Sequence, residues 1–228
     1  MPHTPTSRTL ARYACAGAAL WLSVAPAIAQ QASDPKGPAV AVPAGTYVAD
    51  PNHMRFTWSV DHMGLAPYTA RFNGPRMVLE FDPERIEDSS ITVTVDPRTI
   101  DTGYQGERSW DEELATSAKY LHAPEHPTAT FRSTEVVRTG PTAATVTGDL
   151  TLLGVTRPVT FDVTYSGSAA PQGPIEVPTI GFTATGTFDR TEHGLTTLAP
   201  PEPGAPGPGN RGIGRTVTVA VEAEFLKQ

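Results

Sequence analysis

Hydrophobic and polar residues alternate along most of the chain after about residue 45. Period-two alternation sends successive side chains to opposite faces of an extended strand, so each run predicts a half-buried β-strand. Gly, Pro, Asn and Asp residues, which favour turns, separate the runs. The runs fall at residues 54–60, 68–72, 77–81, 91–95, 129–131, 146–152, 159–163, 182–188 and 217–225. Eight or nine such strands predict an all-β antiparallel barrel or sandwich.

The clearest of these signals is a hairpin over residues 148–163. Leu150 and Leu152 share one face of its first strand, and Val159 and Phe161 share one face of its second. Gly154, between the strands, can adopt the positive φ that a tight turn requires. The hairpin fixes the phase of both strands and predicts that these four apolar side chains point into the interior.

Two segments interrupt the strand pattern. In residues 106–123, Trp110 and Leu114 are spaced i, i+4, which predicts one or two short helical turns that cover one end of the barrel. Residues 198–210 hold five prolines and three glycines, which excludes a strand interior and predicts an exposed loop.

The N-terminus has the organisation of a secretory signal peptide. Arg8 and Arg12 precede an apolar run that ends in the small residues Ala27 and Ala29, which fit a cleavage site. An uncleaved anchor is the alternative, but the run is short. We therefore expect residues 1–29 to be a signal peptide for export to the periplasm, residues 30–43 to be a flexible mature N-terminus, and residues 44–228 to form one barrel domain.

Composition narrows the classes of partner. The net charge is −7, and loss of Arg8 and Arg12 with the signal peptide makes the mature chain more acidic, which argues against nucleic acid as a partner. Beyond the N-terminal run no stretch is long and apolar enough for stable membrane insertion. The single cysteine, Cys15, leaves with the signal peptide, so no disulfide supports the mature fold.

The chain lacks the motifs of hydrolytic and metal enzymes. It has no Gly-x-Ser-x-Gly and no His-Glu-x-x-His. Asp111, Glu112 and Glu113 are consecutive and point in different directions, so they predict a solvated charged surface. His122 and His126 are four residues apart, but Pro124 between them excludes a shared face of a regular helix. We expect no catalytic residues and no metal site, and histidines that hydrogen-bond to turns.

Several motifs, in the same order along the chain, resemble those of the YceI-like family. Residues 52–64 are similar to its opening motif, in which a His begins the first long strand and His-x-Gly follows. Residues 100–103 (Ile-Asp-Thr-Gly) resemble its Ser-Ile-Asp-Thr-Gly turn, and residues 120–131 its Phe-Phe-Asp-Ala-x-x-Tyr-Pro-x-Ile-x-Phe segment. The hairpin resembles its Gly-Asp-Leu-Thr-x-x-Gly-Val-Thr-x-Pro-Val signature, and residues 189–195 its Asn-Arg-Ser-Asp-Phe-Gly-Ile. Together these matches extend from about residue 45 to residue 225.

This resemblance implies a single lipocalin-like antiparallel β-barrel of about eight strands, located in the periplasm. It implies a non-catalytic protein, a monomer or homodimer, that holds a polyisoprenoid or other long-chain amphipathic lipid, for which a quinone precursor is one candidate, and no other cofactor. Glu113 stands where the family commonly has His, and His193 where it has an aromatic residue, so the contacts to a lipid head group differ from the family pattern.

Spacing alone leaves open whether the apolar faces form a solid core or line a cavity, since an eight-stranded barrel permits either. The resemblance favours a cavity. The residues expected to line it are Phe56, Trp58, Val60, Phe72, Leu79, Phe81, Tyr120, Phe131, Phe161, Phe182 and Phe188. The alternatives are a periplasmic stress or interaction protein with a filled barrel and no ligand, and a metal-dependent hydrolase.

Overall fold

The computed structural model describes residues 41–200 and 212–228. The predicted signal peptide, nearly all of the segment expected to be flexible, and most of the loop expected at residues 198–210 lie outside these ranges. At the start of the described chain, Val42 is buried against the end of the barrel.

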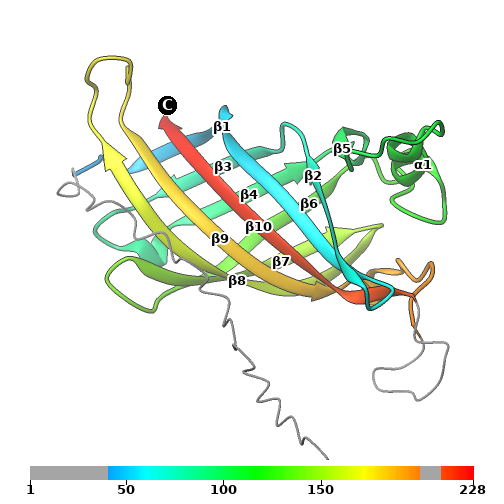
Figure 1. Ribbon diagram of the computed structural model, residues 1–228. Helices are drawn as coiled ribbons and strands as arrows, with labels where there is room; N and C mark the ends of the chain where they lie inside the picture. The colour runs from blue at the N-terminus through cyan, green and yellow to red at the C-terminus, as the bar shows by residue number, and fades with distance from the viewer. Residues whose placement is uncertain (1–40, 201–211) are drawn as a thin grey trace, which may run out of the picture. The chain divides into compact units, whose positions relative to one another are not determined.

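The described residues form ten strands, one α-helix and three short 3₁₀ helices (Figure 1). The strands are β1 (Gly45–His62), β2 (Ala66–Phe72), β3 (Arg76–Phe81), β4 (Ser90–Val95), β5 (Ile100–Asp101), β6 (Ala129–Arg138), β7 (Ala143–Leu152), β8 (Val155–Ala169), β9 (Thr179–Asp189) and β10 (Ile213–Lys227). The helices are α1 (Trp110–Thr116), η1 (Ile86–Asp88), η2 (Pro97–Thr99) and η3 (Arg190–His193).

Eight antiparallel strands close into the predicted barrel. They are hydrogen-bonded in the order β10-β9-β8-β7-β6-β4-β3-β1, and pairing of β1 with β10 completes the ring. The 18-residue β1 pairs with β3 through its first residues and with β2 through its last, so β2 and β5 form a two-stranded extension of the barrel wall. The predicted fold class is therefore confirmed.

A bulge makes β1 longer than the alternation pattern predicts. Its register with β10 shifts between Ala49 and Met54, where the sequence Asp-Pro-Asn resembles a turn. The Asp50 carboxylate accepts a hydrogen bond from the backbone N–H of Asn52, at 2.9 Å, and pairs with the His53 imidazole at 2.7 Å. These contacts satisfy the polar groups of the bulge, so the strand continues beyond it.

The predicted hairpin is formed by β7 and β8. Leu153 and Gly154 form its turn with φ values of 51° and 74°, the left-handed pair that matches the twist of the flanking strands. Leu152 pairs with Val155, and the register continues without interruption to Ala143 and Thr164. Leu150, Leu152 and Phe161 face the barrel interior, and Val159 is buried.

Helix α1 lies with β5 beside one end of the barrel, as the interruption of the strand pattern predicts (Figure 1). Leu114 and Ala115 are buried, and Trp110 and Tyr120 pack edge-on at 5.5 Å. The helix ends at Thr116, and Ser117 N–H donates a hydrogen bond to the Glu113 carbonyl at its C-terminal end.

The opposite end of the barrel is a tightly packed apolar cluster. Tyr47, Met77 and Ile180 are fully buried there, and the Tyr47 hydroxyl donates a hydrogen bond to the Pro43 carbonyl at 2.7 Å. Phe81, Phe182 and Phe225 form edge-to-face contacts around them. Among the described residues, no helix has the length and hydrophobicity needed to cross a bilayer.

Candidate lipid-binding cavity

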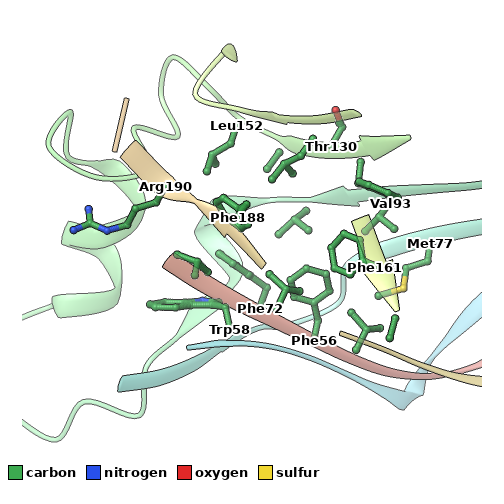
Figure 2. A pocket seen from close by; sticks show the side chains of 18 of the residues that line it. Phe56, Trp58, Phe72, Met77, Val93, Thr130, Leu152, Phe161, Phe188 and Arg190 are labelled. Carbon is green, nitrogen blue, oxygen red and sulfur yellow. The ribbon is translucent and has the colours of Figure 1, made fainter. Parts of the chain in front are cut away.

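The barrel encloses a cavity of about 600 Å³ that extends toward α1 (Figure 2). This volume lies within the range of about 300–1,000 Å³ that is typical of small-molecule sites. Inward-facing side chains of the barrel strands form most of its wall, and α1 and the segments that follow it cover one end. The wall is almost entirely apolar, so the cavity suits a hydrocarbon chain.

The structure brings all the sequence-predicted lining residues to this wall. Phe56, Trp58, Val60, Phe72, Leu79, Phe81, Phe131, Phe161, Phe182 and Phe188 project from the strands, and Tyr120 from the segment after α1. Figure 2 shows Phe56, Phe72, Phe161 and Phe188 around one space. That these residues contact a ligand remains a prediction.

Two inward-facing glycines make room for aromatic rings in the wall. Phe131 and Phe161 pack edge-to-face at 5.2 Å. A Cβ atom on Gly148 would lie 2.6 Å from the Phe131 ring, and one on Gly186 would lie 2.6 Å from the Phe161 ring. The rings therefore approach the backbones of the neighbouring strands closely at these two positions.

The cavity opens at the end near α1. Met63, Tyr104 and Leu198 line the cavity and are also exposed at the protein surface. His62, Tyr68, Tyr120 and Arg190 line the same end. At the opposite end the polar lining groups are Ser89 and Ser90, and the Ser89 hydroxyl already accepts a hydrogen bond from the backbone N–H of Asp82. The wall is thus apolar in depth and more polar at its mouth.

Arg190 is the most buried charged residue of this mouth, and sequence analysis did not single it out. The residue is 4% exposed, and its side chain donates hydrogen bonds to four backbone carbonyls. The acceptors are those of Leu195, Thr197, Ile213 and Gly214. Burial lowers the pKa of its guanidinium, but arginine stays charged in proteins. The contacts fasten residues 195–197 to the start of β10 and so shape the mouth.

Asp189, the residue before Arg190, stabilises the same part of the mouth. Its carboxylate accepts a hydrogen bond from the backbone N–H of Thr191 at 2.8 Å and one from the Arg215 side chain at 2.9 Å. Burial favours a raised pKa, but the hydrogen bonds from Thr191 and Arg215 outweigh it and hold the pKa of Asp189 below its usual value. The stability of this part of the mouth therefore depends on an ionised Asp189 carboxylate.

Trp58 connects the barrel interior with the cover. Its side chain packs against two buried clusters, that of Ile100, Leu114 and Ala115 and that of Val60, Val217 and Val219. The indole Nε1 atom is buried and has no hydrogen-bond partner among the described residues. Trp58 therefore acts as an apolar wall residue that carries an unpaired donor.

Several histidines and carboxylates have structural partners outside the cavity. His193 is 1% exposed and hydrogen-bonds through Nδ1 to the Val155 carbonyl at 3.0 Å. His53 pairs with Asp50 at the bulge, and their hydrogen bond raises the pKa of His53 and lowers that of Asp50. Of the three consecutive carboxylates, Glu112 and Glu113 are exposed, whereas Asp111 is half-buried and accepts a hydrogen bond from the backbone N–H of Thr102.

One sequence argument is corrected by the structure. Pro124 does exclude a regular helix over residues 122–126, yet it does not separate the imidazoles of His122 and His126. Their ring centroids lie 5.9 Å apart because a tight turn replaces the helix. The backbone N–H of His126 bonds to the His122 carbonyl at 2.9 Å. The i, i+4 spacing was the available signal, because a proline that breaks a helix can also favour a turn that brings the same two residues together.

Comparison with known proteins places these features in a family. The sequence profile of the YceI-like domain matches residues 47–225. A UPF0312 protein of Vibrio cholerae is 34% identical over 160 residues, which cover 69% of this chain and 82% of that protein. A UPF0312 protein of Pseudomonas putida is 31% identical over 176 residues, with 77% and 82% covered.

Solved structures with low sequence identity share the fold. Burkholderia cenocepacia BcnA superposes with a TM-score of 0.61 at 21% identity, covering 77% of this chain and 98% of BcnA. A polyisoprenoid-binding domain from Saccharophagus degradans, implicated in plant cell wall breakdown, superposes with a TM-score of 0.54 at 10% identity, covering 82% of this chain and all of that domain.

Proposed function

The chain belongs to the YceI-like domain family, and from that premise we propose that it is a non-catalytic carrier of a polyisoprenoid or other long-chain amphipathic lipid in the periplasm. The observation that carries the proposal is the apolar cavity of about 600 Å³ inside the closed barrel. Burial of apolar surface from water supplies the binding energy, at about 0.8 kcal/mol for each methylene group.

The two ends of the cavity suggest the orientation of the ligand. The apolar tail lies toward Met77 and Phe182, where the wall carries almost no hydrogen-bonding groups. The head group lies near His62, Tyr68 and Tyr120 at the open end. A polar head at the mouth keeps its hydrogen bonds, whereas one buried at the apolar end would lose them at a cost of several kcal/mol.

The fold and lining also bear on the alternative functions. A barrel filled by side chains would leave no cavity of this size, so the structure favours a ligand-holding protein over a solid one. The family is one of binding proteins rather than enzymes, and a neighbour of the same fold is a polyisoprenoid-binding domain. A quinone precursor is one polyisoprenoid that fits this description.

Native mass spectrometry of the protein purified from its own host tests the proposal. We expect a bound lipid of isoprenoid or long-chain type, at about one molecule per chain. Ala184→Trp places a large side chain in the cavity, because Ala184 lines its wall. Thr185→Trp is the matched control, because the adjacent Thr185 is exposed on the outside of the same strand.

Both variants should fold, as judged by circular dichroism, but Ala184→Trp should lose the lipid and Thr185→Trp should keep it. Absence of any co-purifying lipid from the wild-type protein, together with no binding of added polyisoprenoid alcohol, would overturn the proposal. Equal lipid content in the two folded variants would show that the ligand lies elsewhere.

A further inference from the structure

Three potential metal ligands converge at the turn that connects α1 with β6. His122, Glu125 and His126 each offer one ligand atom, and these atoms lie within 4.8 Å of one another. Among the described residues, this is the one group of three or more His, Cys, Asp or Glu side chains that converges in this way. The group lies outside the lipid cavity, and His122 Nδ1 lies beside Glu125 Oε2.

The backbone holds the three residues in place. The His122 carbonyl accepts hydrogen bonds from the backbone N–H groups of both Glu125 and His126, at 3.0 and 2.9 Å. Ala123, between them, is fully buried and is bound from both sides: its N–H donates to the Ala115 carbonyl, and its carbonyl accepts from Arg98. His122 adopts a φ of 44°, which is uncommon for a non-glycine residue, and its imidazole lies 5.9 Å from that of His126.

One ligand–ligand distance already matches that of a tetrahedral ion, and all three ligand atoms lie within 4.8 Å of one another. Two ligand atoms that each lie about 2.1 Å from a tetrahedral zinc ion are about 3.4 Å apart. His122 Nδ1 and Glu125 Oε2 are 3.3 Å apart, which is long for a direct hydrogen bond but close to this ligand–ligand separation. The side chain of Glu125 is 66% exposed and that of His122 is 28% exposed, so both have room to rotate toward an ion.

We propose that His122, Glu125 and His126 form a binding site for a divalent transition-metal ion of the zinc class. Two imidazoles and one carboxylate are ligands typical of Zn²⁺, whereas Mg²⁺ and Ca²⁺ prefer sites made of oxygen atoms alone. Three protein ligands leave at least one coordination position open to solvent, because Glu125 and the neighbouring Pro124 are exposed.

The site is a property of this chain and is independent of the proposed lipid. The family motif that residues 120–131 resemble has Asp and Tyr where this chain has His122 and His126. The site also adjoins the β7–β8 turn, since a Cβ atom on Gly154 would lie 3.3 Å from the His126 ring. Tyr120 and Leu121, directly before it, line the cavity, so a bound ion would anchor the segment that covers the mouth.

Isothermal titration of the tag-free, metal-stripped protein with ZnCl₂ at neutral pH tests the site. We expect about one Zn²⁺ per chain, with affinity reduced about tenfold or more in His122→Ala and in His126→Ala because each removes one of three ligands. His53→Ala is the matched control and should bind as the wild type does, because His53 is an exposed histidine paired with Asp50 in the bulge of β1.

Cobalt provides a second readout. Co²⁺ in place of Zn²⁺ should give the visible absorption of a low-coordinate ion with nitrogen and oxygen ligands, and this absorption should be lost in the His122→Ala, His126→Ala double variant. Thermal melts establish that the variants fold. Zinc affinity in the folded double variant equal to that of the wild type, or no binding by the wild type at micromolar zinc, would overturn the proposal, and neither result would bear on lipid binding.

Discussion

At the scale of single residues, two buried aromatic side chains differ in whether their hydrogen-bond donor has a partner. The buried Tyr47 hydroxyl donates a hydrogen bond to the Pro43 carbonyl, and burial raises its pKa, so it remains a donor. The buried Nε1 atom of Trp58 has no partner among the described residues. A buried donor without a partner costs about 1–3 kcal/mol of stability, whereas a satisfied one contributes about 1 kcal/mol.

Replacing each residue by Phe separates the two effects. Tyr47→Phe should lower the free energy of unfolding by about 1 kcal/mol, because it removes a hydrogen bond and little volume. Trp58→Phe loses apolar contacts but also removes an unpaired donor, so we expect the free energy of unfolding to stay unchanged or to rise. Urea unfolding of the two variants at one pH measures both values. A large loss in Trp58→Phe would indicate that its indole N–H has a partner.

Because of Asp189, the protein should become less stable as the pH falls into the acid range. Its pKa is lowered in the folded chain, so the stabilisation is present above the unfolded value of about 3.9 and is lost as the pH falls through the folded value. Asp189→Asn should lower the free energy of unfolding by about 1–2 kcal/mol at neutral pH, because it weakens the pairing with Arg215 and the cap at Thr191.

Unfolding measured at neutral pH and at about pH 2 checks this assignment. The difference between wild type and Asp189→Asn should shrink as the pH falls through the lowered pKa of Asp189, because protonation removes the charge of the wild-type carboxylate. Glu192→Gln, an exposed neighbour, is the control and should match the wild type at both values. A difference that persists undiminished in acid would mean that the aspartate acts through its shape and not through its charge.

At the scale of elements, the packing of β6 against β7 depends on a residue with no side chain. A Cβ atom on Gly148 would lie 2.4 Å from the Arg132 carbonyl oxygen and 2.6 Å from the Phe131 ring. The backbone oxygen cannot move without breaking the pairing of the two strands. Gly148→Ala should therefore lower the free energy of unfolding by about 1–3 kcal/mol, in spite of the better strand propensity of alanine.

Gly181→Ala is the matched control for this prediction. Gly181 also lies inside a strand, β9, but the atom nearest to a methyl group at this position would be Ser166 Cβ at 3.4 Å, an ordinary contact. Thermal melts should show a clear loss for Gly148→Ala and little change for Gly181→Ala. Equal stabilities would show that the β6–β7 pair can separate enough to admit a methyl group.

The alternation pattern predicts which elements exist but not where each one ends. Phe161 and Leu150 could be assigned to the interior because side-chain direction in a strand follows from spacing alone. The continuation of β1 through Asp50 could not be predicted, because it depends on hydrogen bonds within a bulge. The convergence of His122 and His126 likewise depends on one left-handed backbone angle, which the spacing does not contain.

At the scale of the whole molecule, the cavity results from closure of the sheet. Pairing of β1 with β10 joins the two ends of the barrel sheet, and the inward faces of eight strands then surround one space. Each lining residue could be predicted from its own strand, but the volume of about 600 Å³ depends on how all the side chains pack together. Arg190 shapes the mouth through hydrogen bonds to four carbonyls of two separate segments, which no local pattern predicts.

With an apolar wall of this kind, the Kd should depend more on the length of the ligand's tail than on its head group. In a series of straight-chain alcohols, each added methylene should lower the Kd about fourfold, which corresponds to about 0.8 kcal/mol. The gain should stop when the tail reaches the packed end formed by Tyr47, Met77 and Ile180. Displacement of a fluorescent fatty-acid probe measures the series, and Ala184→Trp should move the plateau to shorter chains because its side chain occupies part of the cavity. The Kd values of an acid and an alcohol of equal length should differ less than those of two alcohols that differ by four methylenes. The reverse result would place the main determinant of binding at the polar mouth, beside His62 and Arg190, and not along the apolar wall.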